Sequence, residues 1–270
     1  QRIRHAVRIS PVGICEQHAV SFAAGLASQG FIPIVCIYST FLQRAFDQVI
    51  EDVCLHSLPV VFCIDRAGVV GEDGKSHHGI FDLSYLGLVP NLIVSAPKDG
   101  DELRNLVRTA INSKKPFAIR YPRGRTEVSF KGMEEVPIGR GEILKDGVDG
   151  VIVGIGDVIK ECLKASELLE DMGISPAVIN ARFLKPLDRE LILNYGKRTG
   201  FVLTVEENVL DGGFGSHILR LFEGEDVKVS CHGLPSAFIE HGPRSLLKEI
   251  YGLTPEAIVR SFMSLRSGVR

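Results

Sequence analysis

The residues of this sequence best suited to acid–base chemistry and anion binding gather in one segment, DRAGVVGEDGKSHHGIFD, at residues 65–82. Carboxylates, an arginine, a lysine and two adjacent histidines occur there among glycines. Histidine exchanges protons near neutral pH, and the planar fork of arginine fits carboxylates and phosphates. A flexible charged surface loop is the simpler interpretation. However, long loops between short elements are more often functional, so the segment predicts a binding or catalytic loop.

A second group of such residues lies in YSTFLQRAFDQ, residues 38–48. Tyr38, Phe41 and Arg44 follow one another at regular intervals, which places Phe41 and Arg44 on one face if the segment is helical. The ordinary alternative puts Phe41 in the core and Arg44 in solvent. A third group is RYPRG, in which Arg120 and Arg123 flank a Tyr-Pro turn.

A carboxylate opens the apolar part of GICEQHAVSFAAGLASQG, residues 13–30. Glu16 precedes a run of small and apolar residues, Ala19 to Ala27, interrupted only by Ser21. Such a run predicts a helix that is buried on nearly every face, with Glu16 at the edge of a core. A carboxyl group loses hydration there, and its pKa can rise. The alternative is a first-turn carboxylate that the helix dipole stabilises.

Short apolar runs typical of buried strands alternate with helical patterns in the first half of the chain. We predict strands at 32–38, 59–65, 92–97 and 117–122, and helices at 41–57 and 99–113. This alternation predicts βαβ units and a mainly parallel sheet. Ligands bind beyond the carboxyl ends of the strands in such a sheet. The three groups above follow strand ends and Glu16 follows a strand-like segment, so we expect all four to meet at one edge.

The pattern lapses between Pro122 and Gly147, where glycine, proline and charged residues are frequent, and then resumes. In the second half we predict strands in GVIVGIG, SPAVINA, FVLTVEE and VKVSCHG, helices at 157–172 and 187–199, and two further helices near the C-terminus. We therefore predict an α/β protein of two domains, each a mainly parallel sheet covered by helices. The expected boundaries are 1–125 for the first domain, 126–147 for a linker and 148–270 for the second domain.

One motif in the second half could be mistaken for a nucleotide site. Gly154 and Gly156 begin a G-x-G-x-x-G pattern, but Ile159 stands where the third glycine should be. An incomplete pattern of this kind is weak evidence, and a tight strand-to-helix turn explains it as well.

The overall composition excludes several classes of protein. The chain has 270 residues, 45% apolar and 24% charged, with a net charge of -2. This balance gives no electrostatic case for binding nucleic acid or an anionic membrane. Its six cysteines are scattered, without a C-x-x-C pair, as is typical of thiols in a reducing compartment, so we expect a cytoplasmic protein. The chain begins without a methionine, and we expect it to be part of a longer polypeptide.

Several stretches occur in the same order as in one enzyme family. GICEQHAVSFAAGLASQG, IYSTFLQRAFDQV, DRAGVVGEDGKSHHGIFDL and RYPRG resemble the 1-deoxy-D-xylulose-5-phosphate synthases, thiamine diphosphate enzymes of the transketolase-like group. NARFLKPLD, VEENVLDGGFGS and FIEHGPRSLL are similar to the C-terminal domain of those enzymes. The resemblance covers nearly the whole chain. It implies a transketolase-like pyrimidine-binding domain followed by a transketolase C-terminal domain.

The resemblance implies a role for each candidate residue. Glu16 would be catalytic, sharing a proton with the pyrimidine ring of thiamine diphosphate in a water-poor pocket, and Phe41 would stack on that ring. His77 matches a histidine near the reacting carbons and would transfer a proton, whereas His78 is expected to be structural. The residues that match the substrate pocket, where arginines hold a phosphate, are Tyr38, Arg44, Arg66, Asp73 and Arg123.

The resemblance also implies a missing domain. The family binds the diphosphate and its Mg²⁺ on a larger N-terminal domain with a Gly-Asp-Gly motif, which these 270 residues lack. The implied activity joins pyruvate and glyceraldehyde 3-phosphate, with loss of CO₂, to give 1-deoxy-D-xylulose 5-phosphate. We expect a homodimer that is inactive without the missing domain and that contributes no metal ligand from this chain. The alternatives are a β-type subunit of a ketoacid dehydrogenase or split transketolase, and a non-catalytic dimerisation fragment.

Overall fold

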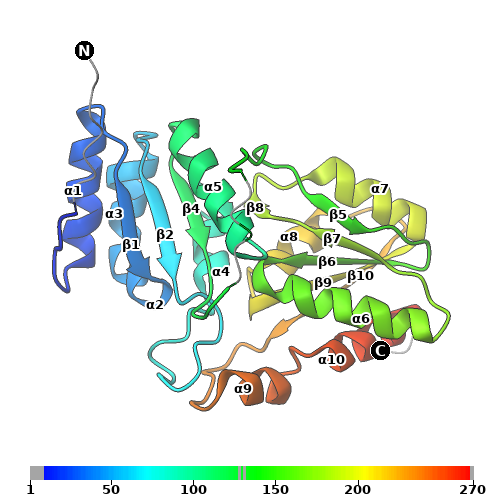
Figure 1. The fold of residues 1–270 in the computed structure, drawn as a ribbon. Helices are drawn as coiled ribbons and strands as arrows, with labels where there is room; N and C mark the ends of the chain where they lie inside the picture. Colours follow the sequence, from blue (N-terminus) through cyan, green and yellow to red (C-terminus); the bar gives the residue numbers. More distant parts are fainter. Residues whose placement is uncertain (1–8, 127–128, 130–131, 268–270) are drawn as a thin grey trace.

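Two β-sheets lie side by side in the computed structural model, each with helices packed on it (Figure 1). The structure describes residues 9–126, 129 and 132–267. Both sheets are mainly parallel, so the predicted fold class, an α/β protein with two mainly parallel sheets covered by helices, is confirmed. Within the described residues, no helix is long and apolar enough to cross a membrane.

The first sheet contains the four strands predicted in the first half. Its order is β1-β2-β4-β3-β8, and the first four strands run parallel. Their bounds are β1 Ile34–Tyr38, β2 Val61–Asp65, β4 Phe117–Arg120 and β3 Ile93–Ser95. The carboxyl ends of the three neighbouring strands therefore lie at one edge, with Tyr38 beside Asp65 and Ile64 beside Arg120.

Both helices predicted between these strands are present. The helix expected at 99–113 is α5 (Gly100–Ser113), and its N-terminus is capped by Asp99, which accepts a hydrogen bond from the Glu102 amide at 2.8 Å. The helix expected at 41–57 is one helical segment that ends at Cys54 and whose pitch changes along its length. Its parts are α2 (Ser39–Leu42), η1 (Gln43–Ala45), α3 (Phe46–Gln48) and η2 (Val49–Cys54). The sequence did not predict the short helix α4 (Asp82–Gly87).

The helix that begins at Glu16 was expected to be buried on nearly every face, and in the single chain that expectation is wrong. Helix α1 (Glu16–Ser28) lies at the outer edge of the first sheet and packs on β1 and η2 (Figure 1). Its buried residues are Val20, Ala23, Ala24 and Ala27. The side chain of Phe22, on another face, is 43% exposed. An apolar run shows that a helix can be buried all round, but an edge position leaves one face without a neighbour.

The second sheet has the order β10-β9-β6-β7-β5. Four of its strands match the predicted runs and lie parallel to their neighbours, whereas β5 is antiparallel to β7. The bounds are β10 Lys228–Leu234, β9 Phe201–Val209, β6 Val151–Ile155, β7 Ala177–Asn180 and β5 Glu142–Lys145. Strand β5 falls inside the segment 126–147 that we expected to be a linker, so the last residues of that segment belong to the sheet.

Helices cover the second sheet as expected. The helices predicted at 157–172 and 187–199 correspond to η3 with α6 and to α7, and two more helices end the chain. The sequence did not predict α8. The bounds are η3 Gly156–Val158, α6 Ile159–Asp171, α7 Arg189–Thr199, α8 Phe214–Leu221, α9 Arg244–Ile250 and α10 Pro255–Ser267.

The two halves of the chain are joined through a shared strand and a shared core. Strand β8 (Phe183–Lys185), from the second half, pairs antiparallel with β3 and completes the first sheet. Arg182, just before it, forms an ion pair with the buried Glu102 of α5 at 2.6 Å. One hydrophobic cluster contains residues from both halves, including Val94 and Val153. This continuity fixes the second half beside β3, on the side of the first sheet opposite β1.

The incomplete glycine motif is part of a tight turn. Gly156, directly after β6, has a φ of +82°, a conformation that favours glycine. A Cβ atom added to Gly154 would lie 2.8 Å from the Ile159 side chain, so the missing side chain lets η3 and α6 pack closely on the strand. The geometry is that of the strand-to-helix turn that the sequence favoured.

Candidate active site

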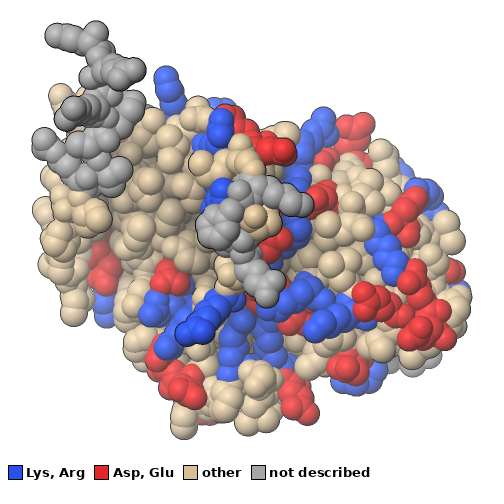
Figure 2. Space-filling model, viewed as in Figure 1, with Lys and Arg blue, Asp and Glu red and all other residues tan. Residues whose placement is uncertain are grey.

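The predicted convergence of the candidate residues at the carboxyl-end edge is observed for the first sheet. β1 ends at Tyr38, β2 ends at Asp65 and β4 ends at Arg120, and these strands are neighbours. Figure 2 shows Lys and Arg side chains gathered on the lower middle of this face, the side toward which β1, β2 and β4 point in Figure 1. Positive charge at this edge suits an anionic substrate.

Aromatic rings and guanidinium groups form a stack at this edge. The rings of Tyr38 and Phe41 are stacked, with centroids 5.6 Å apart and an angle of 16° between their planes. The Arg66 guanidinium lies 3.7 Å from the centre of the Tyr38 ring, and the Arg44 guanidinium lies 5.1 Å from the centre of the Phe41 ring. The His77 ring meets Phe41 edge-on at 5.3 Å. Five of the predicted residues therefore form one contact group.

Glu16 joins this group through a contact that the sequence did not predict. Arg44 Nη1 donates a hydrogen bond to Glu16 Oε1 at 3.2 Å. The Glu16 side chain is only 11% exposed, whereas that of Arg44 is 52% exposed. Glu16 is the first residue of α1, so the alternative of a first-turn carboxylate is compatible with its position. No strand precedes Glu16 among residues 9–15, and residues 1–8 lie outside the described part of the chain.

Asp73 and His77 lie on the loop between β2 and α4, which we call the catalytic loop after its predicted role (residues 68–79), whereas Arg123 lies after β4. Asp73 accepts a hydrogen bond from Arg123 Nη1 at 2.5 Å, which ties the loop to the segment after β4. His77 Nδ1 lies 2.9 Å from the Ser76 hydroxyl, and Thr40 donates to the Ser76 carbonyl at 3.0 Å. These contacts hold the loop close to α2 and to the aromatic stack.

Arg120, unlike Arg123, is buried. Its side chain is 5% exposed and lies 3.0 Å from the fully buried carboxylate of Asp82. Ser39 also donates to Asp82, at 3.0 Å. This cluster lies beneath the stack and supports it, since Ser39 directly follows Tyr38. Sequence reasoning missed Asp82 and Ser39, because nothing in their local sequence shows that a distant arginine folds between them.

Two thiols lie close to the stack, each two residues before the last residue of its strand. Cys36 and Cys63 are paired in register on β1 and β2. A hydrogen bond with the Cys63 thiol lowers the pKa of Cys36 to about 7, although partial burial and the nearby Asp65 act in the opposite direction. The same contact raises the pKa of Cys63, and burial adds to that rise. All six cysteines lie in the described chain and are free.

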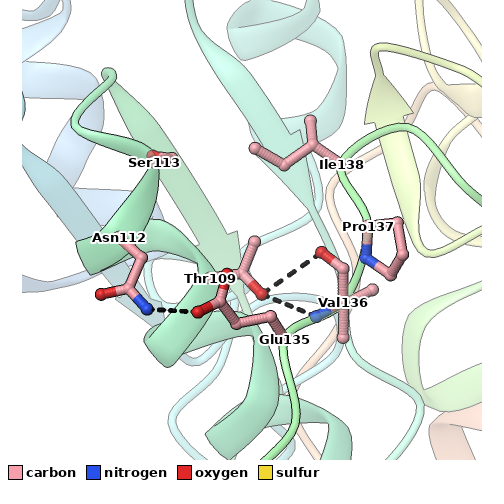
Figure 3. Close-up of a pocket in the computed structure, with 7 residues that line it drawn as sticks. All are labelled: Thr109, Asn112, Ser113, Glu135, Val136, Pro137 and Ile138. Atoms are coloured by element: carbon pink, nitrogen blue, oxygen red, sulfur yellow. Dashed lines mark hydrogen bonds between the residues drawn. The ribbon is translucent and has the colours of Figure 1, made fainter.

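The arrangement fits the aromatic end of a ligand together with an anionic group. It offers ring faces, a nearly buried carboxylate and several guanidinium groups, whereas no cluster of three possible metal ligands occurs among the described residues. A separate hollow of about 350 Å³ lies at the C-terminal end of α5, and residues such as Thr109, Asn112 and Glu135 line it (Figure 3). None of the predicted site residues lines that hollow.

Comparisons with known proteins match both halves of the chain. Residues 2–128 match the family model of the transketolase pyrimidine-binding domain, and residues 139–258 match that of the transketolase C-terminal domain. A solved structure of a split-gene transketolase, described as an inactive β4 tetramer, is 32% identical with a TM-score of 0.88. The match covers 96% of this chain and 84% of that one. The chain belongs to the transketolase family.

Members of this family with curated names are more similar in sequence. The 1-deoxy-D-xylulose-5-phosphate synthase of Pelotomaculum thermopropionicum is 53% identical over 264 residues, which cover 95% of this chain and 41% of that protein. The synthase of Dehalococcoides mccartyi is 50% identical over 264 residues, covering 96% and 41%. The chain therefore spans about two-fifths of the length of the curated relatives that it matches. A transketolase variant from Pichia stipitis shares the fold alone, with a TM-score of 0.77 at 19% identity, covering 94% of this chain and 37% of that one.

Proposed function

We propose that this chain is the part of a cytoplasmic 1-deoxy-D-xylulose-5-phosphate synthase that holds the pyrimidine end of thiamine diphosphate and the acceptor substrate. Identity of 50% and more to synthases over nearly the whole chain carries this proposal. The complete enzyme would join pyruvate and glyceraldehyde 3-phosphate to form 1-deoxy-D-xylulose 5-phosphate and CO₂. A further domain would hold the diphosphate and Mg²⁺, because the chain spans only two-fifths of its relatives.

The residues at the carboxyl-end edge fit the pyrimidine end of the cofactor. Phe41 offers a ring for stacking, and Glu16 offers a carboxyl group that is largely shielded from water and can exchange a proton with a ring nitrogen. When bound, thiamine diphosphate would supply an acidic thiazolium carbon, which once deprotonated is a nucleophile toward the carbonyl carbon of pyruvate. Arg44 contacts both Glu16 and Phe41, so it couples their positions.

The guanidinium groups and the catalytic loop fit a phosphorylated aldehyde. Arg44 and Arg123 are about half exposed and can bind phosphate oxygens in a forked geometry. Arg66 and Tyr38 form the opposite side of the stack, and Asp73 orients Arg123. His77 would move a proton to or from the reacting oxygen of the acceptor.

The nearest alternative is a separately encoded subunit of a split transketolase or ketoacid dehydrogenase. The 32% identity to the split-gene transketolase, over most of both chains, favours it more than any other alternative. We prefer the synthase, because identity to the synthases is higher. A homodimer is part of this proposal, since Ile14 just before α1, Phe22 on α1 and Ile34 on β1 expose apolar side chains in the single chain.

The proposal predicts that the chain alone binds thiamine diphosphate with Mg²⁺ weakly, with a dissociation constant above the micromolar range, and forms no product. Contacts to the metal and the diphosphate dominate the affinity for so highly charged a ligand, and these belong to the further domain. Calorimetry on the chain with and without the diphosphate-binding part of a synthase measures the difference. Micromolar binding by the chain alone, or no gain in product on assembly, would contradict the proposal.

The proposal also predicts that Arg123→Met in the assembled enzyme weakens use of the phosphorylated acceptor by about 10- to 100-fold in kcat/KM. This is the size of a lost charged hydrogen bond, roughly 1.5–3 kcal/mol. Decarboxylation of pyruvate should be nearly unchanged. Arg44→Met should cause a similar loss, but its contact with Glu16 makes Arg123 the cleaner test.

Steady-state kinetics with both substrates make this measurement, with Arg220→Met on α8 as a matched control outside the site. Equal losses on pyruvate and on the acceptor would show that Arg123 is structural.

A further inference from the structure

The catalytic loop, which carries Asp73 and His77, rests on the second half of the chain. Its base is closed by two backbone hydrogen bonds between Gly68 and Gly79, at 2.6 and 2.9 Å. Between these residues, Val69 and Val70 turn inward and are buried. The loop therefore has an inner side against the second half and an outer side that faces the site.

One ion pair from the second half holds both polar backbone groups of Val69. The Val69 amide donates to Glu207 Oε1 on β9 at 2.9 Å. The Val69 carbonyl accepts from Arg244 Nε at the start of α9, also at 2.9 Å. Arg244 Nη2 in turn lies 2.9 Å from Glu207 Oε2. Three residues from two parts of the fold thus form a closed set of contacts.

The Glu207–Arg244 ion pair is largely shielded from solvent, and both of its groups are charged. The Glu207 side chain is 4% exposed. Burial acts to lower the pKa of Arg244, but the carboxylates of Glu207 and Asp157 outweigh it and raise that pKa above its usual value. Asp157 lies 2.9 Å from Arg244, and Lys248 completes the cluster by pairing with Glu161 at 3.1 Å. A charged pair with this geometry gives strong and directional hydrogen bonds.

At Gly68 and Gly71 the loop backbone packs closely against the second half of the chain, and a side chain at either position would be crowded. Gly68 has a φ of +75°, and a Cβ atom added to it would lie 2.7 Å from Glu207 Cδ. Gly71 has a φ of +96° and would place a Cβ atom 3.2 Å from the Gly242 carbonyl oxygen.

His78 adds a further link between the loop and the second half. Its Nδ1 accepts from the Val70 amide at 3.1 Å, and its Nε2 lies 3.0 Å from the Glu240 carbonyl oxygen. His78 was expected to be structural, and these contacts agree with a structural role.

We propose that Glu207 and Arg244 are positioning residues that act through the backbone of Val69, so that the second half of the chain sets the position of His77 and Asp73 for the reaction. This inference rests on the proposed function for its effect on turnover. Its effect on the loop itself follows from the contacts alone. Among the described residues, the side chains of Glu207 and Arg244 show no contact with Glu16, His77 or Asp73, so their action is through the loop. The Glu207 backbone carbonyl accepts from Arg120 Nη2 at 3.1 Å, and a change of the Glu207 side chain keeps this carbonyl in place.

Glu207→Gln in the assembled enzyme tests the inference, because the amide keeps the size of the side chain but breaks the ion pair. Glu161→Gln is the matched control, since it removes a carboxylate of the same cluster that does not contact the loop. Hydrogen–deuterium exchange of residues 66–80, followed by mass spectrometry, should become at least tenfold faster in Glu207→Gln and stay near wild type in Glu161→Gln. Product formation should fall about 10- to 100-fold only in Glu207→Gln, as expected for lost charged hydrogen bonds.

A double-mutant cycle separates positioning from general damage. If Glu207 acts through His77, adding Glu207→Gln to His77→Ala should lower product formation by less than about threefold, because coupled residues are not additive. Arg244→Lys, which keeps the charge but loses the Nε contact with Val69, should change exchange and turnover in the same direction as Glu207→Gln.

Unchanged exchange of residues 66–80 in both variants would overturn the inference, as would fully additive losses in the cycle. Faster exchange with control-level turnover would also overturn it, since the loop would then be held for another reason. A wild-type assembly that forms no product refutes the proposed synthase activity instead, and the exchange comparison then decides alone whether the ion pair holds the loop.

Discussion

Replacing Glu16 with glutamine in the assembled enzyme should lower product formation by about 10²- to 10⁴-fold, the usual contribution of a positioned acid–base group. Glutamine keeps the size of the side chain and can still accept a hydrogen bond from Arg44, but its amide cannot give up and regain a proton as a carboxyl group does. The free energy of unfolding should change by less than about 1 kcal/mol, because the Glu16–Arg44 pair is partly exposed to solvent. Steady-state product formation and urea unfolding measure the two effects.

Glu51→Gln, at an exposed carboxylate of the neighbouring η2, is the control and should change neither quantity appreciably. If Glu16 served only as a first-turn carboxylate of α1, the pattern would be reversed. Stability would then fall by about 0.3–1 kcal/mol while product formation stayed at the wild-type rate.

The second large effect is on stability. Asp82→Asn should lower the free energy of unfolding by about 3–5 kcal/mol, because it leaves the Arg120 cation buried without its counter-charge. Asp82 is fully buried and Arg120 is 5% exposed, with 3.0 Å between them. Because both side chains are so deeply buried, water cannot take the place of the lost Asp82 carboxylate. Urea unfolding followed by circular dichroism measures the loss.

Glu225→Gln provides the comparison, because Glu225 forms an exposed ion pair with Lys197 at 2.8 Å. Exposed pairs contribute about 1 kcal/mol or less, so this change should be nearly silent. Replacing both members of the buried pair, as Asp82→Leu with Arg120→Met, should restore part of the stability that Asp82→Asn loses. Equal effects of Asp82→Asn and Glu225→Gln would contradict the buried-pair account.

The main strands and helices were predictable because each carries a strong local pattern. The apolar runs that became β1, β2, β6 and β9 are continuous and flanked by turn residues, although β1 is partly exposed in the single chain. β8 and β5 were not predicted, although they are no shorter than β3 and β4. β5 carries two charged residues and lies in the segment rich in glycine, proline and charge that we expected to be a linker. Strand β8 also forms by pairing with β3, more than 80 residues away. Such a pairing forms only in the folded chain, so the local sequence does not predict it.

The candidate site was predictable to the extent that it follows topology. Parallel strands bring their carboxyl ends together, so the grouping of Tyr38, Phe41, Arg66 and His77 could be expected from strand order. The pairing of Glu16 with Arg44 could not, because it depends on where α1 packs. The roles of Glu207 and Arg244 could not be expected either, because their contacts with Val69 cross 138 and 175 residues of sequence.

The most direct test of the account is the rate at which the thiazolium C2 proton of bound thiamine diphosphate exchanges with deuterium in the assembled enzyme. This exchange reports proton transfer on the cofactor without requiring either substrate. Quenched-flow NMR on the wild-type and Glu16→Gln enzymes measures it directly. The account predicts that the glutamine variant exchanges at least 100-fold more slowly than the wild type. Exchange at the wild-type rate in the variant would contradict the assignment of Glu16 as the activating acid.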